Sequence, residues 1–531
     1  MFAAQHIPYN QTNAFTKIVL DYLNGSENLK PFYDHPPTLE GILNTIQEKQ
    51  KQPVNRQVLV EALQQQYRNV ETSELVRKNI ELLGSEKTFT ITTAHQPNLF
   101  SGPLYFIYKI LHAAKLTGWL KTQLPEYNFV PVYYMGSEDA DFAELNHTYV
   151  DGKKIEWTKV QKGAVGRMLV DKTLVQLIDE LEGQLGNEAN GPEVIQLLRR
   201  CYTLGTNIQT ATFQLVDELC AAYGLVVLIP DHPALKAQMK PVFEEELFLN
   251  VSAEIVQQTS KRLEEHYNVQ AHPREINLFY LKEDIRERII RKDDAFVVHN
   301  TNLRFTEQQM REELELHPER FSPNVILRGL FQETILPNLV FIGGGGEMAY
   351  WLQLKDLFHH YKTVYPVLVL RNSFLVVEKK WKEKMDRTGF AVAELFQPQD
   401  QLMNQVVARN SEHTVSLNGN FEKAEELFGQ IMEQAGSIDP TLVQHVAAIK
   451  ARSFKVLQEL EKKMLRAEKR KFSDHERQIQ VLKAALFPGN GLQERKENFS
   501  GFYAKWGKAF IEALYQHSLT LEQEFVALLE R

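Results

Sequence analysis

Short apolar segments that favour β-structure recur along the chain from Thr88 onward, and helical patterns separate several of them. These segments are apolar at nearly every position, which is typical of parallel strands that helices cover on both faces. The helical patterns include Leu104–Trp119 and Val194–Tyr223. This alternation predicts an α/β fold whose parallel sheet has right-handed crossovers. The five expected strands are Phe89–Thr93, Phe129–Met135, Leu225–Ile229, Leu339–Ile342 and Val364–Leu370.

The segments around these strands follow other patterns. Residues 1–85 are mainly helical, for example in Asn13–Tyr22 and Asn55–Tyr67, and predict a segment that wraps the core. Alternating polarity in Ile276–Tyr280 and Ala295–Phe305 predicts a small antiparallel sheet in an insertion. The expected divisions after residue 85 are a core in three parts (86–149, 191–269 and 321–375), two connecting insertions (150–190 and 270–320) and a mixed linking region (376–440).

The last part of the chain predicts a helical coiled-coil hairpin over 441–531. Thr441–Leu486 holds no Gly or Pro, and its apolar residues from Leu457 to Ala467 follow the 3-4 spacing of a coiled-coil seam. A turn at Pro488–Gly491 would let a second helical pattern, Phe499–Leu529, fold back antiparallel. Either this hairpin or a second subunit could fill the seam, and we expect a homodimer.

Length and composition limit the functional classes. At 531 residues the chain is too long for one ordinary core, and 43% hydrophobic with 24% charged residues is typical of a soluble globular protein. The net charge of -8 argues against nucleic acid as a main partner. Two cysteines, Cys201 and Cys220, allow neither a disulfide framework nor a multi-cysteine metal site, which fits a reducing cytoplasm. We find no signal segment and no apolar run of about 20 residues, so we expect no membrane partner.

The first candidate site follows the first expected strand. His95 and Gln96 come at its carboxyl end, where α/β enzymes place chemistry. Ser101 could cap the next helix, whose first turn tolerates Pro103. Free amides at a helix start attract anions, so His95 and Gln96 would face an anionic ligand. An ordinary capped turn with a loop histidine is the alternative.

The second candidate site is acidic and follows the second expected strand. Glu138, Asp139, Asp141 and His147 crowd this strand end, where they could hold an amine or a sugar hydroxyl or act as a general base. We interpret the nearby Glu144 as a helix-start charge that favours the helix dipole. The spacing does not match the two-histidine helix of a zinc enzyme, so no protein-held metal is expected.

The third candidate site joins a helix to a glycine-rich strand end. Four glycines follow the strand and precede Glu347 and Tyr350, and such a turn lets backbone amides approach a phosphate or carboxylate closely. The pattern is neither the dinucleotide fingerprint nor a P-loop, and a tight crossing without a ligand is the alternative. Arg328 and Arg371 could clamp an anion. The site's remaining candidates are Gln332, Glu333, Gly343, Gly344, Gly345 and Gly346.

Motifs in these sites share their order and separation with one family. The motif residues are Thr93–Gln96 with Ser101–Tyr105 and Lys109; Glu138, Asp139 and Asp141 with Asn146 and His147; Arg328, Gln332, Glu333 and Pro337 with Gly343–Glu347, Tyr350 and Trp351; and Leu492–Arg495. Over nearly the whole chain they resemble the BshC family, the cysteine-adding enzymes of bacillithiol biosynthesis. Family members carry Gly-Gln-Gln where this chain has Ala94-His95-Gln96, so the resemblance does not assign a role to His95.

The resemblance implies a Rossmann-like core with connecting-peptide insertions and a coiled-coil domain that dimerises. It also implies a cytoplasmic ligase that joins the carboxyl group of cysteine to the amino group of glucosaminyl-malate, the last step of bacillithiol biosynthesis. Forming an amide from a free carboxylate needs activation, for which ATP with Mg²⁺ is expected, and a base to deprotonate the amine. Asp141, His147 and His95 are the catalytic candidates. The substrate-binding candidates are Gln96, Glu138, Asp139, Arg328, Gln332, Glu333, Gly343, Gly344, Gly345, Gly346, Glu347, Tyr350 and Arg371.

Two other functions fit the same residues. In a nucleotidyltransferase acting on a small phosphorylated substrate, His95 would face phosphates and cysteine would play no part. In a non-enzymatic dimeric scaffold, the coiled coil would carry the function and the glycines would be structural.

Overall fold

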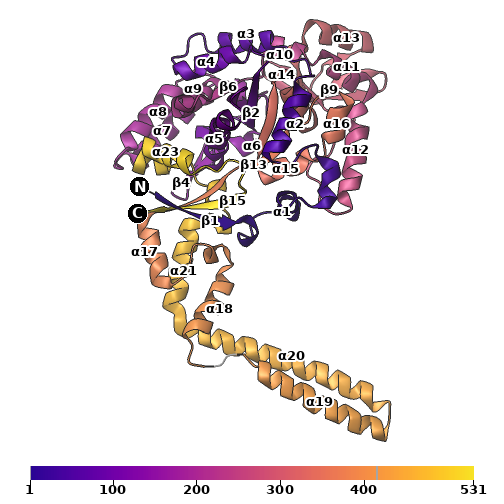
Figure 1. The fold of residues 1–531 in the computed structure, drawn as a ribbon, viewed down its shortest axis with the longest axis vertical. Coiled ribbons are helices and arrows are strands. Elements are labelled where there is room, and N and C mark those ends of the chain that lie inside the picture. The colour runs from indigo at the N-terminus through magenta and orange to yellow at the C-terminus, as the bar shows by residue number, and fades with distance from the viewer. Residues whose placement is uncertain (1, 414–415) are drawn as a thin grey trace. The chain divides into compact units, whose positions relative to one another are not determined.

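The computed structural model describes residues 2–413 and 416–531. It divides into two compact units (Figure 1). The first contains nearly all of the chain before Val377 together with Gly491–Arg531, and the second contains Val377–Asn490 with Gln11–Asn13. The second unit is therefore inserted into the chain of the first.

A five-stranded parallel sheet forms the centre of the first unit, as the apolar segments predict. Its strand order is β13-β12-β2-β3-β6, and every neighbouring pair is parallel. Val364 and Tyr365 stay outside the last strand because Pro366 has no N–H to donate to a neighbour. The strands are β2 (Thr88–His95), β3 (Asn128–Met135), β6 (Val226–Leu228), β12 (Asn338–Gly343) and β13 (Val367–Leu370).

Helices between the strands cover the sheet and bury its apolar side chains. The core combines Phe89 and Ile91 of β2 with Leu116 of α5 and with Ile42 and Ile46 of the N-terminal region. The predicted helix Val194–Tyr223 is two helices, because Gly205 adopts a left-handed φ of 84° and Asn207 caps the second one. The covering helices are α2 (Leu39–Lys49), α5 (Tyr105–Gln123), α8 (Gly191–Cys201), α9 (Ile208–Cys220), α14 (Val325–Ile335), α15 (Gly345–Trp351) and α16 (Lys355–His360).

The N-terminal segment holds the expected helices but begins with a strand. Strand β1 (Phe2–Pro8) pairs antiparallel with β15 (Glu524–Glu530), in a sheet whose third strand is β14 (Ser373–Val377). Only Phe2 and Ile7 of β1 are buried, and the residues between them are partly or fully exposed. Its helices are α1 (Lys17–Leu23), α3 (Arg56–Gln66) and α4 (Glu74–Leu82), which join α2.

Both insertions leave the central sheet and add their own elements. The first holds the hairpin β4 (His147–Val150) and β5 (Lys153–Glu156), followed by α7 (Lys172–Leu185). The second forms the predicted antiparallel sheet, in the order β10-β9-β8-β7-β11. Its elements are α10 (Pro233–Ala237), α11 (Lys240–Leu249), α12 (Val251–Glu264), β7 (Leu278–Lys282), β8 (Ile285–Lys292), β9 (Ala295–Val298), β10 (Arg304–Phe305), α13 (Glu307–Leu316) and β11 (Phe321–Pro323).

The second unit is helical and contains an antiparallel hairpin of α19 (Asn418–Ile438) and α20 (Leu442–Lys469) (Figure 1). The rings of Phe421 and Phe454 lie 5.6 Å apart across its seam, and Lys450 pairs with Glu425. The helix that precedes α20 thus packs on it through Phe454, whereas Leu460 of the predicted seam is 47% exposed. The unit's other helices are α17 (Lys379–Thr388), α18 (Gln399–Asn410) and α21 (Ser473–Leu486).

The predicted partner of that seam, Phe499–Leu529, instead belongs to the first unit. It forms α22 (Phe499–Trp506), α23 (Lys508–His517) and β15, because Gly507 breaks the helical pattern with a left-handed φ of 59°. Gln493 leads the chain back by donating to Val376 O at 3.1 Å and accepting from Val376 N at 2.9 Å. In the part of the chain that the structure describes, no helix combines the length and apolar character needed to cross a bilayer.

Candidate functional site

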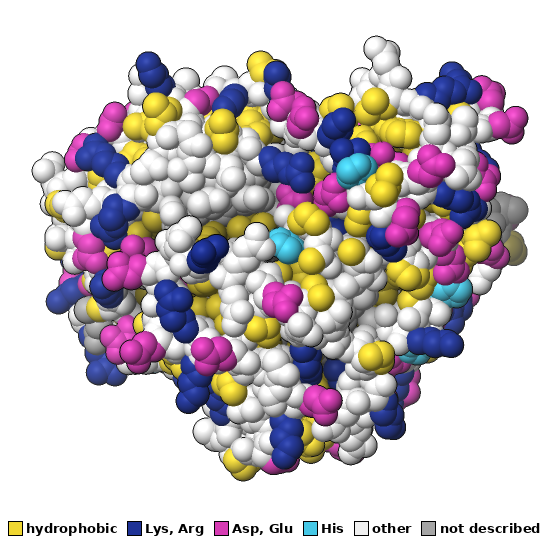
Figure 2. Space-filling model, turned by 90° about the horizontal axis from the view of Figure 1, so that it is seen from above, with side chains coloured by type: hydrophobic (Ala, Val, Ile, Leu, Met, Phe, Trp, Pro, Cys, Tyr) yellow, Lys and Arg dark blue, Asp and Glu magenta, His cyan; other side chains and the backbone are white. Residues whose placement is uncertain are grey.

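A cavity of about 780 Å³ opens at the carboxyl ends of the central strands. It brings together residues of all three predicted sites, and the second insertion and the C-terminal segment add further walls. Positive and negative side chains are interspersed over the face in Figure 2, whereas five arginines line the cavity. Its charged and histidine lining residues are His95, Glu138, Asp139, Glu144, His272, Arg274, Arg286, Arg328, Glu347, Arg371 and Arg495.

The first loop places His95 and Gln96 on the wall as predicted, but not by the predicted cap. Helix α5 starts at Tyr105 instead of after Ser101, because Phe100 and Ser101 have left-handed φ values of 50° and 71°. Asn498 holds this turn by donating to the carbonyl oxygens of Phe100 and Gly102 at 2.8 and 2.6 Å. The turn brings the His95 ring into an edge contact with Tyr105, at 5.3 Å between centroids.

His95 is held in a cationic environment. Burial, followed by the charges of Lys109, Arg371 and Arg328, lowers the pKa of His95 well below its usual range. The imidazole is therefore neutral at physiological pH, and its Nε2 lies 3.4 Å from the Tyr105 hydroxyl. A neutral ring there can exchange a hydrogen bond with a ligand but binds protons weakly.

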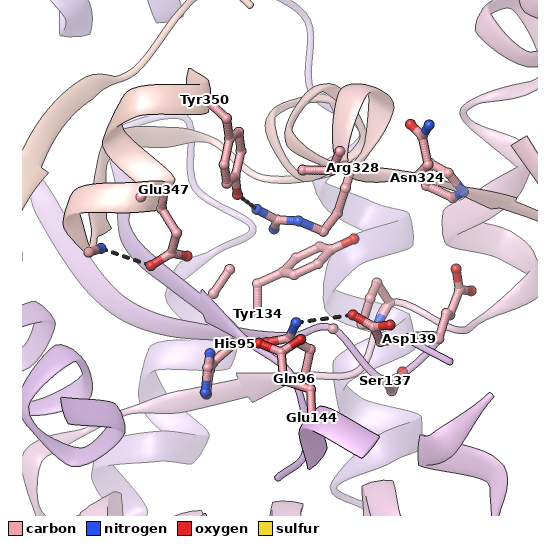
Figure 3. Close-up of a pocket in the computed structure, with 18 of the residues that line it drawn as sticks. His95, Gln96, Tyr134, Ser137, Asp139, Glu144, Asn324, Arg328, Glu347 and Tyr350 are labelled. Atoms are coloured by element: carbon pink, nitrogen blue, oxygen red, sulfur yellow. Dashed lines mark hydrogen bonds between the residues drawn. The ribbon is translucent and has the colours of Figure 1, made fainter. Parts of the chain in front are cut away.

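The acidic site turns two carboxylates to the cavity and fixes both. Glu138 forms an ion pair with the fully buried Lys236 and accepts a hydrogen bond from Ser322 Oγ at 2.7 Å. Asp139 accepts from Gln96 Nε2 at 3.0 Å (Figure 3) and from the backbone N–H of Ala140 at 2.6 Å. These contacts tie the second strand end to the first loop and to both ends of the second insertion.

Asp141 and His147 lie outside the cavity lining, while Glu144 lies in it. The Asp141 carboxylate caps the short helix α6 (Phe142–Leu145) by accepting from Glu144 N at 3.3 Å. The His147 ring packs against Tyr149, at 5.9 Å between centroids, where the hairpin of the first insertion begins. The cap turns the chain so that the side chain three residues later, Glu144, points to the cavity.

The glycine turn lies on the wall, but the chain itself supplies an anion there. Gly344, Gly345 and Gly346 line the cavity at the start of α15, whereas Gly343 ends β12 outside the lining. Glu347 Oε2 accepts from Gly344 N at 2.8 Å (Figure 3) and from Lys109 Nζ at 2.6 Å. Lys109 is 1% exposed and donates its other bond to Ala94 O at 2.6 Å. An amide expected to meet a ligand is thus engaged by Glu347.

Arg328 and Arg371 both reach the cavity but differ in their free donors. Arg328 Nη2 donates to Tyr350 Oη at 2.6 Å (Figure 3), and its buried Nη1 has no partner among the described residues. Arg371 donates to Glu494 Oε1 at 2.6 Å and to Ser373 Oγ at 3.1 Å, and Glu494 is fully buried. Arg371 therefore holds the C-terminal segment, while Arg328 keeps a donor for a ligand.

Gln332 and Glu333, predicted as substrate-binding residues, are fully buried and lie outside the cavity lining. Glu333 Oε1 accepts from Gln332 at 2.9 Å and from Asn338 at 2.8 Å, and Lys49 lies 3.8 Å from its Oε2. Burial lowers the pKa of Lys49 to about 8. These residues lie too deep because a helix rises about 1.5 Å per residue, which takes Glu333 roughly 7 Å beyond Arg328 along α14.

Sequence patterns missed three arginines of the cavity. Arg286 stacks on Phe279, with 4.0 Å from its guanidinium carbon to the ring centroid, and Arg274 comes from the same insertion. Arg495 follows Glu494 in the C-terminal segment. Burial lowers the pKa of Arg286, which faces Asp139 and Glu138. The residues that surround these three arginines are remote in the chain, and the only local signal was the Leu492–Arg495 motif around Arg495.

Comparisons with known proteins assign nearly the whole chain to one family. Residues 2–372 match the family described as "Bacillithiol biosynthesis BshC, N-terminal Rossmann-like domain", and residues 374–529 match "Bacillithiol biosynthesis BshC, C-terminal coiled-coil domain". A protein of Flavobacterium johnsoniae is 42% identical over 521 residues, which is 98% of each chain. Similar proteins of Flavobacterium psychrophilum and Cytophaga hutchinsonii are 40% and 39% identical and cover 96% and 97% of each chain. All three are named "Putative cysteine ligase BshC".

Proposed function

Because this chain belongs to the BshC family of bacillithiol biosynthesis, we propose that it joins L-cysteine to the amino group of glucosaminyl-malate. The observation that carries this proposal is a cavity that combines an arginine donor without a partner among the described residues with a fixed acidic wall. Such a cavity suits a substrate that carries both carboxylates and sugar hydroxyls. Its volume of about 780 Å³ lies within the range of small-molecule sites.

Arg328 is the proposed anchor for the malate part of the substrate. Its Nη1 is buried without a partner among the residues that the structure describes, and a buried donor left unpaired is unfavourable. A carboxylate would accept from this guanidinium in a charge-assisted hydrogen bond. Tyr350 fixes the other guanidinium nitrogen and so orients the donor.

The acidic wall is the proposed site for the sugar. Glu138 and Asp139 keep fixed positions through Lys236, Ser322 and Gln96. Carboxylates held in this way accept hydrogen bonds from hydroxyls without first having to be ordered. Gln96 provides an amide beside them on the same wall.

Activation of the cysteine carboxyl group is proposed to use ATP with Mg²⁺. Arg274 and Arg495 line the cavity, and the contacts of the described residues leave both guanidinium groups without a hydrogen bond or ion pair. They could meet phosphate oxygens. The glycine turn is a weaker candidate because Glu347 already accepts from Gly344 N.

The test incubates the purified protein with cysteine, glucosaminyl-malate and ATP and follows bacillithiol by mass spectrometry. We expect product only when all three are present. Product without a nucleotide would refute activation by ATP, and no product under any condition would refute the ligase. Pyrophosphate release that ignores cysteine would identify a nucleotidyltransferase instead.

The second unit is proposed to form the homodimer. On α20 the exposed apolar residues Leu442, Ile449, Val456 and Leu460 recur at intervals of seven and four, which places them on one stripe. Val456 is 61% exposed beside a seam that α19 already fills. Exposed apolar stripes of this kind mark helix-packing surfaces.

Sedimentation equilibrium tests the dimer. We expect a mass twice the 61.4 kDa of the chain, and the double variant I449E/V456E should halve it while keeping its helical circular dichroism. The control L316E changes a residue that is 71% exposed on α13 of the first unit and should stay dimeric. A wild-type monomer, or a dimeric double variant, would contradict this surface.

A further inference from the structure

Amide formation needs a base, because the attacking amine is an ammonium ion at neutral pH and must lose a proton before it can act as a nucleophile. The base has to lie on the wall of the cavity, within reach of the substrate nitrogen. Resting on the ligase function proposed above, we propose that Glu144 is the general base that accepts the proton of the attacking amine. Sequence patterns had indicated only a helix-start charge at this position.

The other carboxylates of the cavity are already engaged. Lys236 and Ser322 hold Glu138, and Lys109 holds Glu347 together with an amide of the glycine turn. Hydrogen bonds and cations stabilise the charged form of a carboxylate and so weaken it as a base. Both groups fit binding roles better than proton transfer.

Asp139 is engaged in a different way, at both of its oxygens. Its Oδ1 accepts from two backbone N–H groups, those of Ala140 at 2.6 Å and Asp141 at 3.1 Å. Its Oδ2 accepts from Gln96 Nε2 at 3.0 Å. Both oxygens of Asp139 are therefore already held by donors of the protein.

Glu144 differs from these carboxylates in its contacts. Within residues 2–413 and 416–531, no hydrogen bond or ion pair reaches its carboxylate, although its backbone N–H donates to Asp141. Figure 3 shows Glu144 near Gln96, with Arg328 and Tyr350 across the cavity. A substrate held by Arg328 would thus present its other end towards Glu144.

The charges around Glu144 favour proton uptake. Partial burial, followed by the neighbouring carboxylates of Asp139 and Asp141, raises the pKa of Glu144 above its usual range. The hydroxyl of Tyr105 faces it from α5, and Arg495 acts on the same hydroxyl from the C-terminal segment. A carboxylate with a raised pKa is the stronger base once it is ionised.

His95 and His272 are the remaining cavity side chains that could accept a proton, and His272 is an exposed residue of the second insertion. Burial, followed by three cations, lowers the pKa of His95 well below its usual range, which makes the ring a weak proton acceptor. Asp141 and His147 lie outside the cavity lining. The geometry therefore favours Glu144 over each predicted base.

In the proposed step, one ammonium proton moves to the Glu144 carboxylate, and the freed nitrogen lone pair attacks the carboxyl carbon of cysteine that a nucleoside triphosphate has activated. The C–N bond forms, the C–O bond to the phosphate leaving group breaks, and its electron pair leaves with the phosphate. The phosphate takes up the second proton that the nitrogen loses, and Glu144 releases the first proton to water.

The test compares E144Q with E126Q, a matched loss of charge at an exposed glutamate outside the cavity lining. We expect E144Q to slow amide formation by about 10²–10⁴-fold, with nucleotide-dependent activation of cysteine and the KM for glucosaminyl-malate within about threefold of wild type. The acid limb of the kcat/KM profile should disappear. E126Q should retain that limb and most of the rate.

A second nucleophile separates a base from a merely structural residue. Hydroxylamine is unprotonated at neutral pH and needs no base, so E144Q should form cysteine hydroxamate at the wild-type rate. Amide formation by E144Q within threefold of wild type, or a retained acid limb, would overturn the assignment of Glu144 alone. A wild-type enzyme that forms no amide with any nucleoside triphosphate would overturn the ligase function as well.

Discussion

Replacing Lys109 with methionine tests the claim that the glycine turn is stabilised from within the protein. The substitution keeps the length and apolar character of the side chain but removes its charge. Glu347 then loses its cation, and Ala94 O loses a donor at 2.6 Å. The carboxylate of Glu347 would remain beside Gly344 N without compensation.

The expected cost follows from the exposure of the two partners. Removing one partner of a buried ion pair costs about 3–5 kcal/mol, and the lower end applies because the side chain of Glu347 is 25% exposed. Because the unfolding entropy grows with size and the first unit has roughly 400 residues, a loss of about 3 kcal/mol in the free energy of unfolding lowers the midpoint temperature by about 3 °C. K87M removes a lysine that is exposed just before β2 and should change the free energy of unfolding by less than about 0.5 kcal/mol.

Differential scanning calorimetry of K109M, E347Q and the double variant completes the test. If the two side chains interact as the distances indicate, the double variant should be about 2 kcal/mol more stable than the sum of the single losses predicts. Additivity within about 0.5 kcal/mol would refute the pair. The glycine turn would then have to be stabilised by other contacts, and Gly344 N would again be available to a ligand.

Three further predictions concern other charged groups. R328A should weaken glucosaminyl-malate binding about 30-fold in calorimetric titration, a loss of about 2 kcal/mol. Unchanged affinity would show that Arg328 does not bind the malate part. The control R199A changes an exposed arginine outside the cavity and should bind the substrate with wild-type affinity. E494Q leaves the buried guanidinium of Arg371 without its partner and should lower the free energy of unfolding by about 3–5 kcal/mol, whereas an unchanged melting midpoint would mean that Arg371 relies on other contacts. Burial raises the pKa of Asp217 to about 6, so its contribution to stability is present below pH 4 and is lost as pH rises through 6. D217N should therefore melt at a higher temperature than wild type at pH 8 and lose this advantage in acid. A difference in melting temperature that does not depend on pH would contradict the raised pKa of Asp217.

The central sheet could be predicted because its signal is local. Each strand is buried on both faces, so every side chain in Leu339–Ile342 is apolar, and Phe89–Thr93 combines apolar residues with buried threonines. The carboxyl-end loops then follow from the topology, which explains why His95, Gln96 and the glycine turn meet in one cavity.

The details of the cavity depend on contacts that are distant in sequence. A count of carboxylates near residue 140 cannot show that Asp141 turns away to cap α6 and thereby aims Glu144 inward. Arg274 comes from an insertion whose position over the sheet has no local signal. The helical pattern in Phe499–Leu529 corresponds to α22 and α23, but Gly507 separates these helices and the last residues form β15, which pairs with β1.

The pairing of β1 with β15 has a consequence for synthesis. During translation the first strand leaves the ribosome more than 500 residues before its partner, and the whole helical insertion is made in between. The first unit therefore remains without its closing strand until Glu524–Glu530 emerges. Nascent chains arrested before that point should expose β1 to proteases, although the inserted hairpin α19–α20 is already complete.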